Sequence, residues 1–154
     1  MKDLSNNIAT AVSIKNAVKT AAENGTGVDL QGYEGATVIV DVGAEGDTLS
    51  SSVHFEVSLE HSDDNSTFTD VAQADIVDGT ISSGGIFLKL DGTANGNPDT
   101  AGEIFRVGYR GGKRYIRVVL AKTGTHSNGT PLGAFIIKSH ARSSGDNAFT
   151  AHAS

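Results

Sequence analysis

Four polar side chains on one predicted strand come nearest to an enzyme site in this chain. His54, Glu56, Ser58 and Glu60 alternate with apolar residues, so we expect them to share one face of a strand. A hydroxyl, an imidazole and a carboxylate are the groups of nucleophilic hydrolysis. The pattern supplies no sheltered pocket and no third group to orient the base. It therefore favours exposed strand residues, and the sequence predicts neither a catalytic site nor an enzyme.

A hydrolytic or glycan-binding β module is the alternative that a cleft would favour. Glycoside hydrolysis needs two carboxylates that face each other across the substrate. Glu56, Glu60, Asp63 and Asp70 lie close enough in the sequence to be considered for such a pair. A deep pocket holding two of them would support hydrolysis, whereas a shallow, convex surface would support a binding protein.

Metal and cofactor sites are not predicted. The five histidines are scattered without a close pair, and there is no cysteine to form a zinc site or a disulfide. Two loops rich in Asp and Asn resemble calcium loops, which need Gly at the sixth position and Glu at the twelfth. The loop from Asp63 has Phe68 and Ala74 there, and the loop from Asp91 has the required Gly but ends on Gly102.

A basic cluster is the charged feature that most favours a binding role. No acidic residue lies between Ile104 and Lys122, and two tyrosines are interleaved with the basic residues. Arg and Tyr often anchor protein interfaces, and basic residues with aromatics can also bind nucleic acid. The chain has a net charge of −6 and no nucleic-acid motif, so protein contact is favoured and nucleic acid disfavoured. The predicted contact residues are Arg106, Arg110, Lys113, Arg114 and Arg117.

The two halves of the chain differ in charge. Residues 1–77 hold 3 basic and 13 acidic side chains, whereas residues 78–154 hold 9 basic and 5 acidic ones. This asymmetry permits acidic and basic patches that attract neighbouring molecules, but solvated strand faces are the favoured explanation.

The repeated short alternations predict an all-β fold, either an antiparallel β-sandwich or a jelly-roll-like barrel. Strands are expected at residues 37–42, 53–60, 86–90, 104–109, 115–120 and 135–138, with a polar turn at 62–66 and a return strand at 68–71. Gly111-Gly112 indicates a hairpin. The expected inward set is Val38, Val40, Val42, Val53, Phe55, Val57, Leu59, Leu88, Val107, Ile116, Val118, Leu120, Phe135 and Ile137.

Three segments are expected: an extended N-terminal arm (1–27), a β domain (28–142) and a polar C-terminal tail (143–154). The arm contains a short predicted strand near residues 11–20, but too little local sequence to bury its apolar residues alone. It therefore needs another surface, either on its own body or on a neighbour. The predicted contact residues in the arm are Leu4, Ile8, Val12, Ile14 and Val18. No apolar run approaches the roughly 18 residues of a membrane span, and a signal peptide is not expected.

Four stretches resemble the amino-acid sequences of a family of small virion proteins from tailed bacteriophages: MKDLSNNI, TGVDLQGYEGATVIV, LEHSDDNSTFTDV and VGYRGGKRYIRVVL. The resemblance runs from Met1 to about Arg142. It implies a non-enzymatic structural role in the virion, and leaves the capsid surface, the neck and the tail open. A compact β body with tails at both ends suits a capsid decoration or cement protein, which is therefore favoured over a neck, head–tail connector or tail protein. The expected partners are the major capsid protein and other copies of the chain, with a trimer favoured because symmetric shells repeat one contact. The expected location is the capsid surface, after synthesis in the host cytoplasm.

Overall fold

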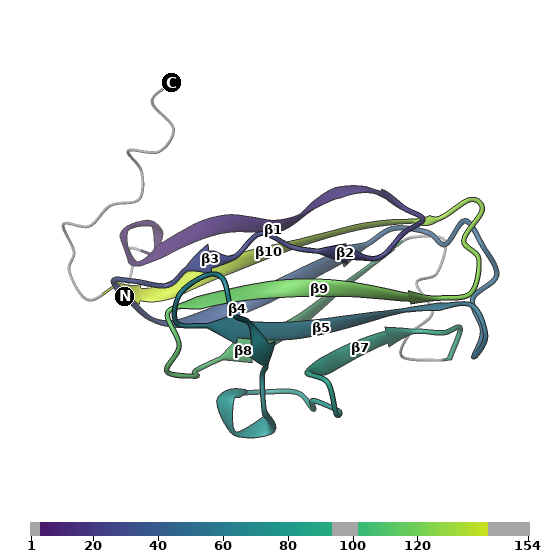
Figure 1. Cartoon of the computed structure of the whole chain (residues 1–154). Coiled ribbons are helices and arrows are strands. Elements are labelled where there is room, and N and C mark those ends of the chain that lie inside the picture. The colour runs from purple at the N-terminus through teal and green to yellow at the C-terminus, as the bar shows by residue number, and fades with distance from the viewer. Residues whose placement is uncertain (1–3, 94–101, 142–154) are drawn as a thin grey trace.

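The computed structural model describes residues 4–93 and 102–141, and these form two antiparallel sheets packed face to face (Figure 1). Sheet A has the order β1-β10-β4-β8. Sheet B has β9 and β5 at its centre, with β2 and β3 along the free side of β9 and with β6 and β7 along the free side of β5. The predicted β-sandwich is therefore confirmed. The strands are β1 (Ile8–Lys19), β2 (Glu23–Asn24), β3 (Val28–Asp29), β4 (Tyr33–Val42), β5 (His54–Ser62), β6 (Thr69–Asp70), β7 (Ile86–Leu90), β8 (Glu103–Tyr109), β9 (Tyr115–Thr123) and β10 (Thr130–Ala141).

Helix in the described residues is limited to two short 3-10 turns, η1 (Ser5–Asn7) and η2 (Gln73–Asp75). Neither has the length and apolar composition needed to cross a membrane.

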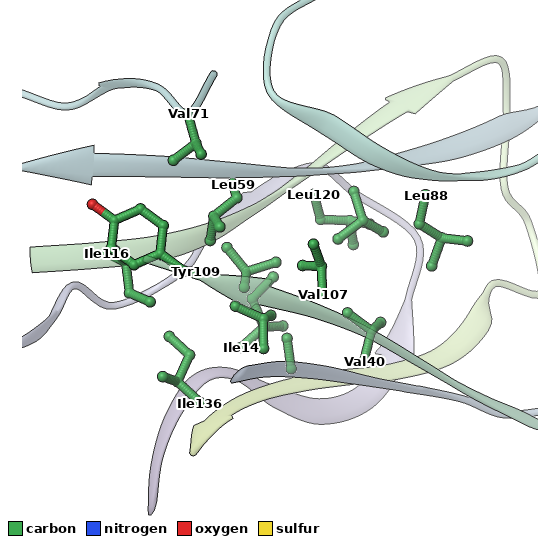
Figure 2. Close-up of a cluster of buried hydrophobic side chains, with 14 of the residues drawn as sticks. Ile14, Val40, Leu59, Val71, Leu88, Val107, Tyr109, Ile116, Leu120 and Ile136 are labelled. Atoms are coloured by element: carbon green, nitrogen blue, oxygen red, sulfur yellow. The ribbon is translucent and has the colours of Figure 1, made fainter. Parts of the chain in front are cut away.

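Alternating apolar residues build the core between the two sheets. On β4, Val38, Val40 and Val42 are fully buried, because strict alternation turns every second side chain toward sheet B. Figure 2 shows side chains from both sheets meeting in this layer. Eleven of the fourteen residues expected to point inward are buried: Val38, Val40, Val42, Phe55, Val57, Leu59, Leu88, Val107, Ile116, Val118 and Leu120.

The predicted orientation of the last strand is wrong. On β10 the buried apolar side chains are those of Leu132, Ala134 and Ile136, so Phe135 and Ile137 face away from the core. Three consecutive apolar residues carry no alternation, and the orientation of this strand is visible only when the preceding Leu132 and Ala134 are counted. Val53, also expected inside, is half-buried just before β5 begins.

The predicted N-terminal arm packs against the β domain of its own chain. β1 pairs with β10 from Ile8, opposite Ser139, to Lys19, opposite Thr130, so it is the edge strand of sheet A. Register shifts on either side of Ile14 interrupt the alternation and turn this side chain into the core, where it is 1% exposed. Residues 8–19 are thus part of the sandwich rather than an arm outside it.

Ser13 ties β1 to the opposite sheet. Its buried hydroxyl accepts the backbone N–H of Val118 on β9 at 2.9 Å and donates to the Thr26 carbonyl at 3.1 Å. Gly25 must be glycine there, because an added Cβ would lie 2.4 Å from Ser13 Oγ and 2.5 Å from the Val118 carbonyl oxygen. β1 therefore closes one side of the sandwich.

The predicted polar turn after β5 is held by one carboxylate. Asp64 Oδ1 accepts the backbone N–H groups of Ser66 at 2.9 Å and Thr67 at 2.8 Å, and the Ser62 hydroxyl at 2.8 Å. Asn65 takes the left-handed conformation, with φ of 59°, which Asn tolerates better than most residues. These hydrogen bonds lower the pKa of Asp64 from 3.8 to about 2.

We expect this turn to make folding sensitive to strong acid. The Asp64 carboxylate binds a proton more weakly in the folded than in the unfolded chain, so its stabilising contribution is complete above about pH 4 and is lost as the pH falls toward 2. In thermal melts between pH 2 and pH 6, the melting temperature should fall less with decreasing pH for Asp64→Asn than for the wild type. Asp70→Asn, which removes an exposed carboxylate from β6, is the control, and its melting temperature should fall as much as that of the wild type. The same fall in Asp64→Asn as in the wild type would contradict this role for the turn.

Candidate functional site

The segment joining β8 to β9 crosses between the two sheets and carries most of the predicted basic cluster. β8 lies in sheet A and β9 in sheet B, so the prediction of a β8–β9 hairpin is wrong. The Gly111-Gly112 pair instead allows a tight crossing over Tyr109. A Cβ on Gly111 would lie 2.4 Å from the Tyr109 hydroxyl oxygen, so only glycine fits at that position.

Tyr109 and His61 form a polar contact beneath this crossing. The Tyr109 hydroxyl lies 3.0 Å from His61 Nδ1, and the tyrosine ring is buried with 1% of its surface exposed. Burial raises the pKa of Tyr109 to about 12 and lowers the pKa of His61. Both groups are therefore held neutral near pH 7, which suits a structural contact between the sheets.

Arg114 and Arg117 are hydrogen-bonded to carboxylates of the same chain. Arg114 donates to both carboxylate oxygens of Asp29 on β3, at 3.0 and 2.7 Å. This paired hydrogen bond is the main cause that lowers the pKa of Asp29, and it raises the pKa of Arg114. Arg117 on β9 donates to Glu60 on β5 at 2.7 Å, and its guanidinium lies 4.0 Å from the centre of the Phe68 ring.

The other three basic residues differ in their contacts. Lys113 pairs with Asp63. Arg106 on β8 lies 3.9 Å from Asp78, but its side chain is 73% exposed. Arg110 donates to the Ala74 carbonyl at 3.2 Å and is exposed.

These contacts explain the charge asymmetry of the sequence. The strands interleave, so Asp29, Glu60 and Asp63 from the acidic half lie beside Arg114, Lys113 and Arg117 from the basic half. The expectation that the cluster meets a neighbour's carboxylates is therefore weakened for these three basic residues, because their carboxylates are already supplied. For Arg106 and Arg110 it stays a prediction.

A polar hollow of about 340 Å³ lies beside the crossing segment. Gly-rich backbone at residues 31–35 and 111–112 lines it, together with Tyr33, Glu34, Asp63, Lys113 and Arg114. Of the four carboxylates considered for glycoside hydrolysis it contains only Asp63, which pairs with Lys113. The arrangement therefore gives no support to a two-carboxylate cleft built from that set.

The polar face of β5 is not the solvated surface that the sequence suggested. His54 and Ser58 are buried, with 7% and 9% exposure, and His54 Nε2 lies 3.5 Å from Glu56 Oε1. Glu56 also lies 3.7 Å from Lys89 on β7. The imidazole and carboxylate do lie close together, but in the described part of the chain no hydrogen bond joins Ser58 to His54, so the pair does not activate this hydroxyl as a nucleophile.

Metal-binding clusters can be assessed for most of the chain. Among residues 4–93 and 102–141, no three His, Asp or Glu side chains are arranged to hold a metal ion. In the first calcium-like loop, Asp64 instead binds the backbone of its own turn. Most of the second such loop lies outside the described residues.

The arm residues predicted to bind a partner fall into two groups. Ile14 is in the core and is therefore removed from the predicted contact set, and Ile8 is half-buried. Leu4, Val12 and Val18 are 64%, 56% and 58% exposed.

Val12 and Val18 belong to an apolar surface that the sequence interpretation missed. In the sheet register, Val12 lies opposite Phe135, Phe135 opposite Ile39, and Ile39 opposite Arg106, so one row crosses all four strands on the side away from the core. Val18 and Ile104 lie on the same side, as judged from their paired residues Pro131 and Asp41. We call this surface, made of Val12, Val18, Ile39, Ile104, Arg106, Phe135 and Ile137, the outer face of sheet A.

Most of the exposed apolar bulk in the described residues gathers there. Five large hydrophobic side chains are strongly exposed: Leu4, Val12, Val18, Val77 and Ile104. Three of them lie on the outer face of sheet A, and Val77 sits against Gly108 on the same side. This surface also contains a hollow of about 210 Å³, which is lined by Phe135 and Val12 among others. Contiguous exposed apolar surface of this kind marks interaction sites in soluble proteins.

Both predicted contact segments therefore contribute side chains to one surface, although Arg106 is the sole residue of the predicted basic set in it. Val12 from the arm and Arg106 from the basic cluster lie at opposite ends of the same row of sheet A, although 94 positions separate them in the sequence. The signal that could have revealed this surface is the outward orientation of Phe135 and Ile137. Comparison of the chain with protein-family models and with curated proteins finds no match.

Proposed function

We propose that this chain is a non-enzymatic structural protein of a tailed-phage virion, a capsid decoration protein that binds the major capsid protein shell. Two things support the proposal: the sequence resemblance to small virion proteins, and one structural observation, the exposed apolar outer face of sheet A. Docking a protein on this face costs little desolvation, because the outward residues of β10, β4 and β8 include only two charged side chains in the described chain, Asp41 and Arg106. Its burial would contribute affinity at about 25 cal/mol per Å² of apolar surface.

The distribution of charge supports the same role. The basic residues near the crossing are largely neutralised by carboxylates of their own chain, so they supply little free charge for a nucleic acid. Exposed ion pairs at Arg106 or Arg110 would set the register of a protein contact more than its strength. Decoration of a shell suits such a surface, because many weak, repeated contacts reinforce one another.

Particle binding tests this proposal. Val12→Lys places a charge on the outer face of sheet A at an exposed position, and we expect it to weaken binding to undecorated particles by about tenfold or more, since an unpaired buried charge is costly. Co-sedimentation with particles at several protein concentrations measures the effect. Ala121→Lys makes the same charge change at an exposed site on β9 of sheet B and should bind like the wild type. Full occupancy by Val12→Lys would reject this docking face.

Electron microscopy of the native particle separates the capsid surface from the alternative positions. Density for the chain at the neck or in the tail would replace the decoration role with a connector or tail role. In either place the outer face of sheet A should be covered.

A further inference from the structure

β8 leaves part of sheet A open at its edge. It is the last strand in the order β1-β10-β4-β8, and among the described residues only 75–78 bond to its outer side, at its C-terminal end. Gly108 N–H donates to Asp78 Oδ1 at 2.9 Å, and the Gly108 carbonyl accepts the N–H of Val77 at 3.0 Å. Both backbone groups of Gly108 thus point away from β4.

Two further residues of β8 also point their backbone N–H and C=O groups away from β4. Backbone groups of alternate residues point to the same side in an antiparallel strand, so the N–H and C=O groups of Ile104 and Arg106 also point away from β4. No described residue bonds to these four groups. The side chain of Arg106 is 73% exposed, and Ile104 is 70% exposed. An unpaired strand edge of this kind is a template for another strand.

We propose that a second copy of this chain adds to the open edge of β8 by antiparallel pairing of β8 with β8. In this register Ile104 of each copy lies opposite Arg106 of the other, and Phe105 lies on the two-fold axis. The four free groups of each copy are then used in four ladder hydrogen bonds. The contact is closed and self-complementary, as expected for a two-fold dimer.

The length of the open edge favours a second copy over a longer foreign strand. Residues 75–78 cover the edge beyond residue 107, so a partner strand must leave it after about five residues. β8 is preceded by Gly102, whose φ of 78° turns the chain. In the proposed register the β8 strand of the second copy begins opposite residue 107, next to Gly108, to which Val77 and Asp78 of the first copy are bonded.

Charge complementarity also favours a second copy. Among the outward residues of β10, β4 and β8, the only charged ones in the described chain are Asp41 and Arg106. Asp41 lies opposite Ile104 in the register of sheet A. Pairing the edges therefore places Arg106 of the second copy in the same row as Asp41, beyond Ile104, within reach of its long side chain. The contact repeats on the other side of the two-fold axis.

The pairing joins the two copies of sheet A into one eight-stranded sheet. Because the two-fold axis is perpendicular to that sheet, the outer faces of both copies point the same way. The dimer thus presents a docking surface of twice the width. The inference concerns the free protein and does not depend on which protein docks there.

Cysteine cross-linking tests the register directly, because the chain has no native cysteine. Opposed residues in a hydrogen-bonded antiparallel pair have Cα atoms about 5.5 Å apart, which suits a disulfide. We expect an oxidised mixture of Ile104→Cys and Arg106→Cys full-length proteins to form a covalent dimer. Each variant alone should not, because identical residues are offset by two positions in this register. Equal cross-linking in the mixture and in the single variants, or none in the mixture, would overturn the register.

Proline substitution tests whether the backbone edge makes the contact. Sedimentation equilibrium should show a dimer for the wild type. Arg106→Pro removes an N–H that bonds to none of the residues that the structure describes, so it should keep the wild-type melting behaviour of the monomer and raise the Kd of the dimer by about a hundredfold. Arg106→Ala keeps the N–H and should weaken the dimer far less.

Other outcomes reject the dimer. A wild-type monomer or trimer would overturn it, and unfolding of Arg106→Pro would show that the edge is already paired within the chain. The particle-binding assay with Val12→Lys reports separately on the virion role, so the failure of one proposal leaves the other open to its own test.

Discussion

Deletion of residues 1–20 is expected to unfold the protein, not to leave a folded body without its arm. The deletion removes all of β1, which pairs along most of β10. It also removes Ile14, a fully buried core side chain whose loss alone is worth about 2–5 kcal/mol. Small domains are stable by only about 5–15 kcal/mol, so losing the strand, its ladder and its core residue together exceeds what the fold can tolerate.

The hydrogen bonds of Ser13 add to the expected loss. Without its hydroxyl, the N–H of Val118 would be left unpaired in the interior, at a cost of about 1–3 kcal/mol. Circular dichroism and thermal melting of the deletion variant should show neither strand signal nor a cooperative transition.

Deletion of residues 1–7 is the matched control. It removes η1 and the exposed Leu4 but stops before β1 begins. This variant should melt cooperatively, close to the wild type. A cooperative melt of the longer deletion would mean that β1 is dispensable and would contradict its place in the sandwich.

The sequence predicted the parts of the fold that depend on strict alternation. On β4, β5 and β9 every second residue is apolar, and these residues are buried as expected. Alternation failed on β1, because the register shifts around Ile14 break the period of two. It failed on β10, because Phe135, Ile136 and Ile137 form an unbroken apolar run.

Long-range pairing could not be predicted from local patterns. The Gly111-Gly112 turn looked like a hairpin because a turn signal does not say whether the next strand returns to the same sheet. Arg114 and Asp29 are 85 positions apart, and only the interleaving of β3 and β9 brings them together. The basic cluster was therefore visible, but its neutralisation was not. The outer face of sheet A was missed for the same reason, since its row joins four separate strands.

The substitution Phe55→Ala is expected to lower the free energy of unfolding by about 3–5 kcal/mol. Phe55 lies in the middle of sheet B with no exposed surface, between Leu90 on β7 and Lys122 on β9 in the register. Its ring centre lies 3.9 Å from that of His126, so truncation leaves a cavity and also strips the packing from the buried imidazole. Urea denaturation monitored by circular dichroism measures the change.

Phe135→Ala is the matched control for this prediction, because it removes the same atoms from the outer face of sheet A. Phe135 is half-buried there and should cost about 1 kcal/mol, since much of its ring is already in contact with water. The two variants should share the same m-value, which would show that stability has changed and not the unfolded state. Equal losses of unfolding free energy in the two variants would mean that Phe135 is as buried as Phe55. In that case Phe135 and Ile137 would point into the core, as the sequence predicted.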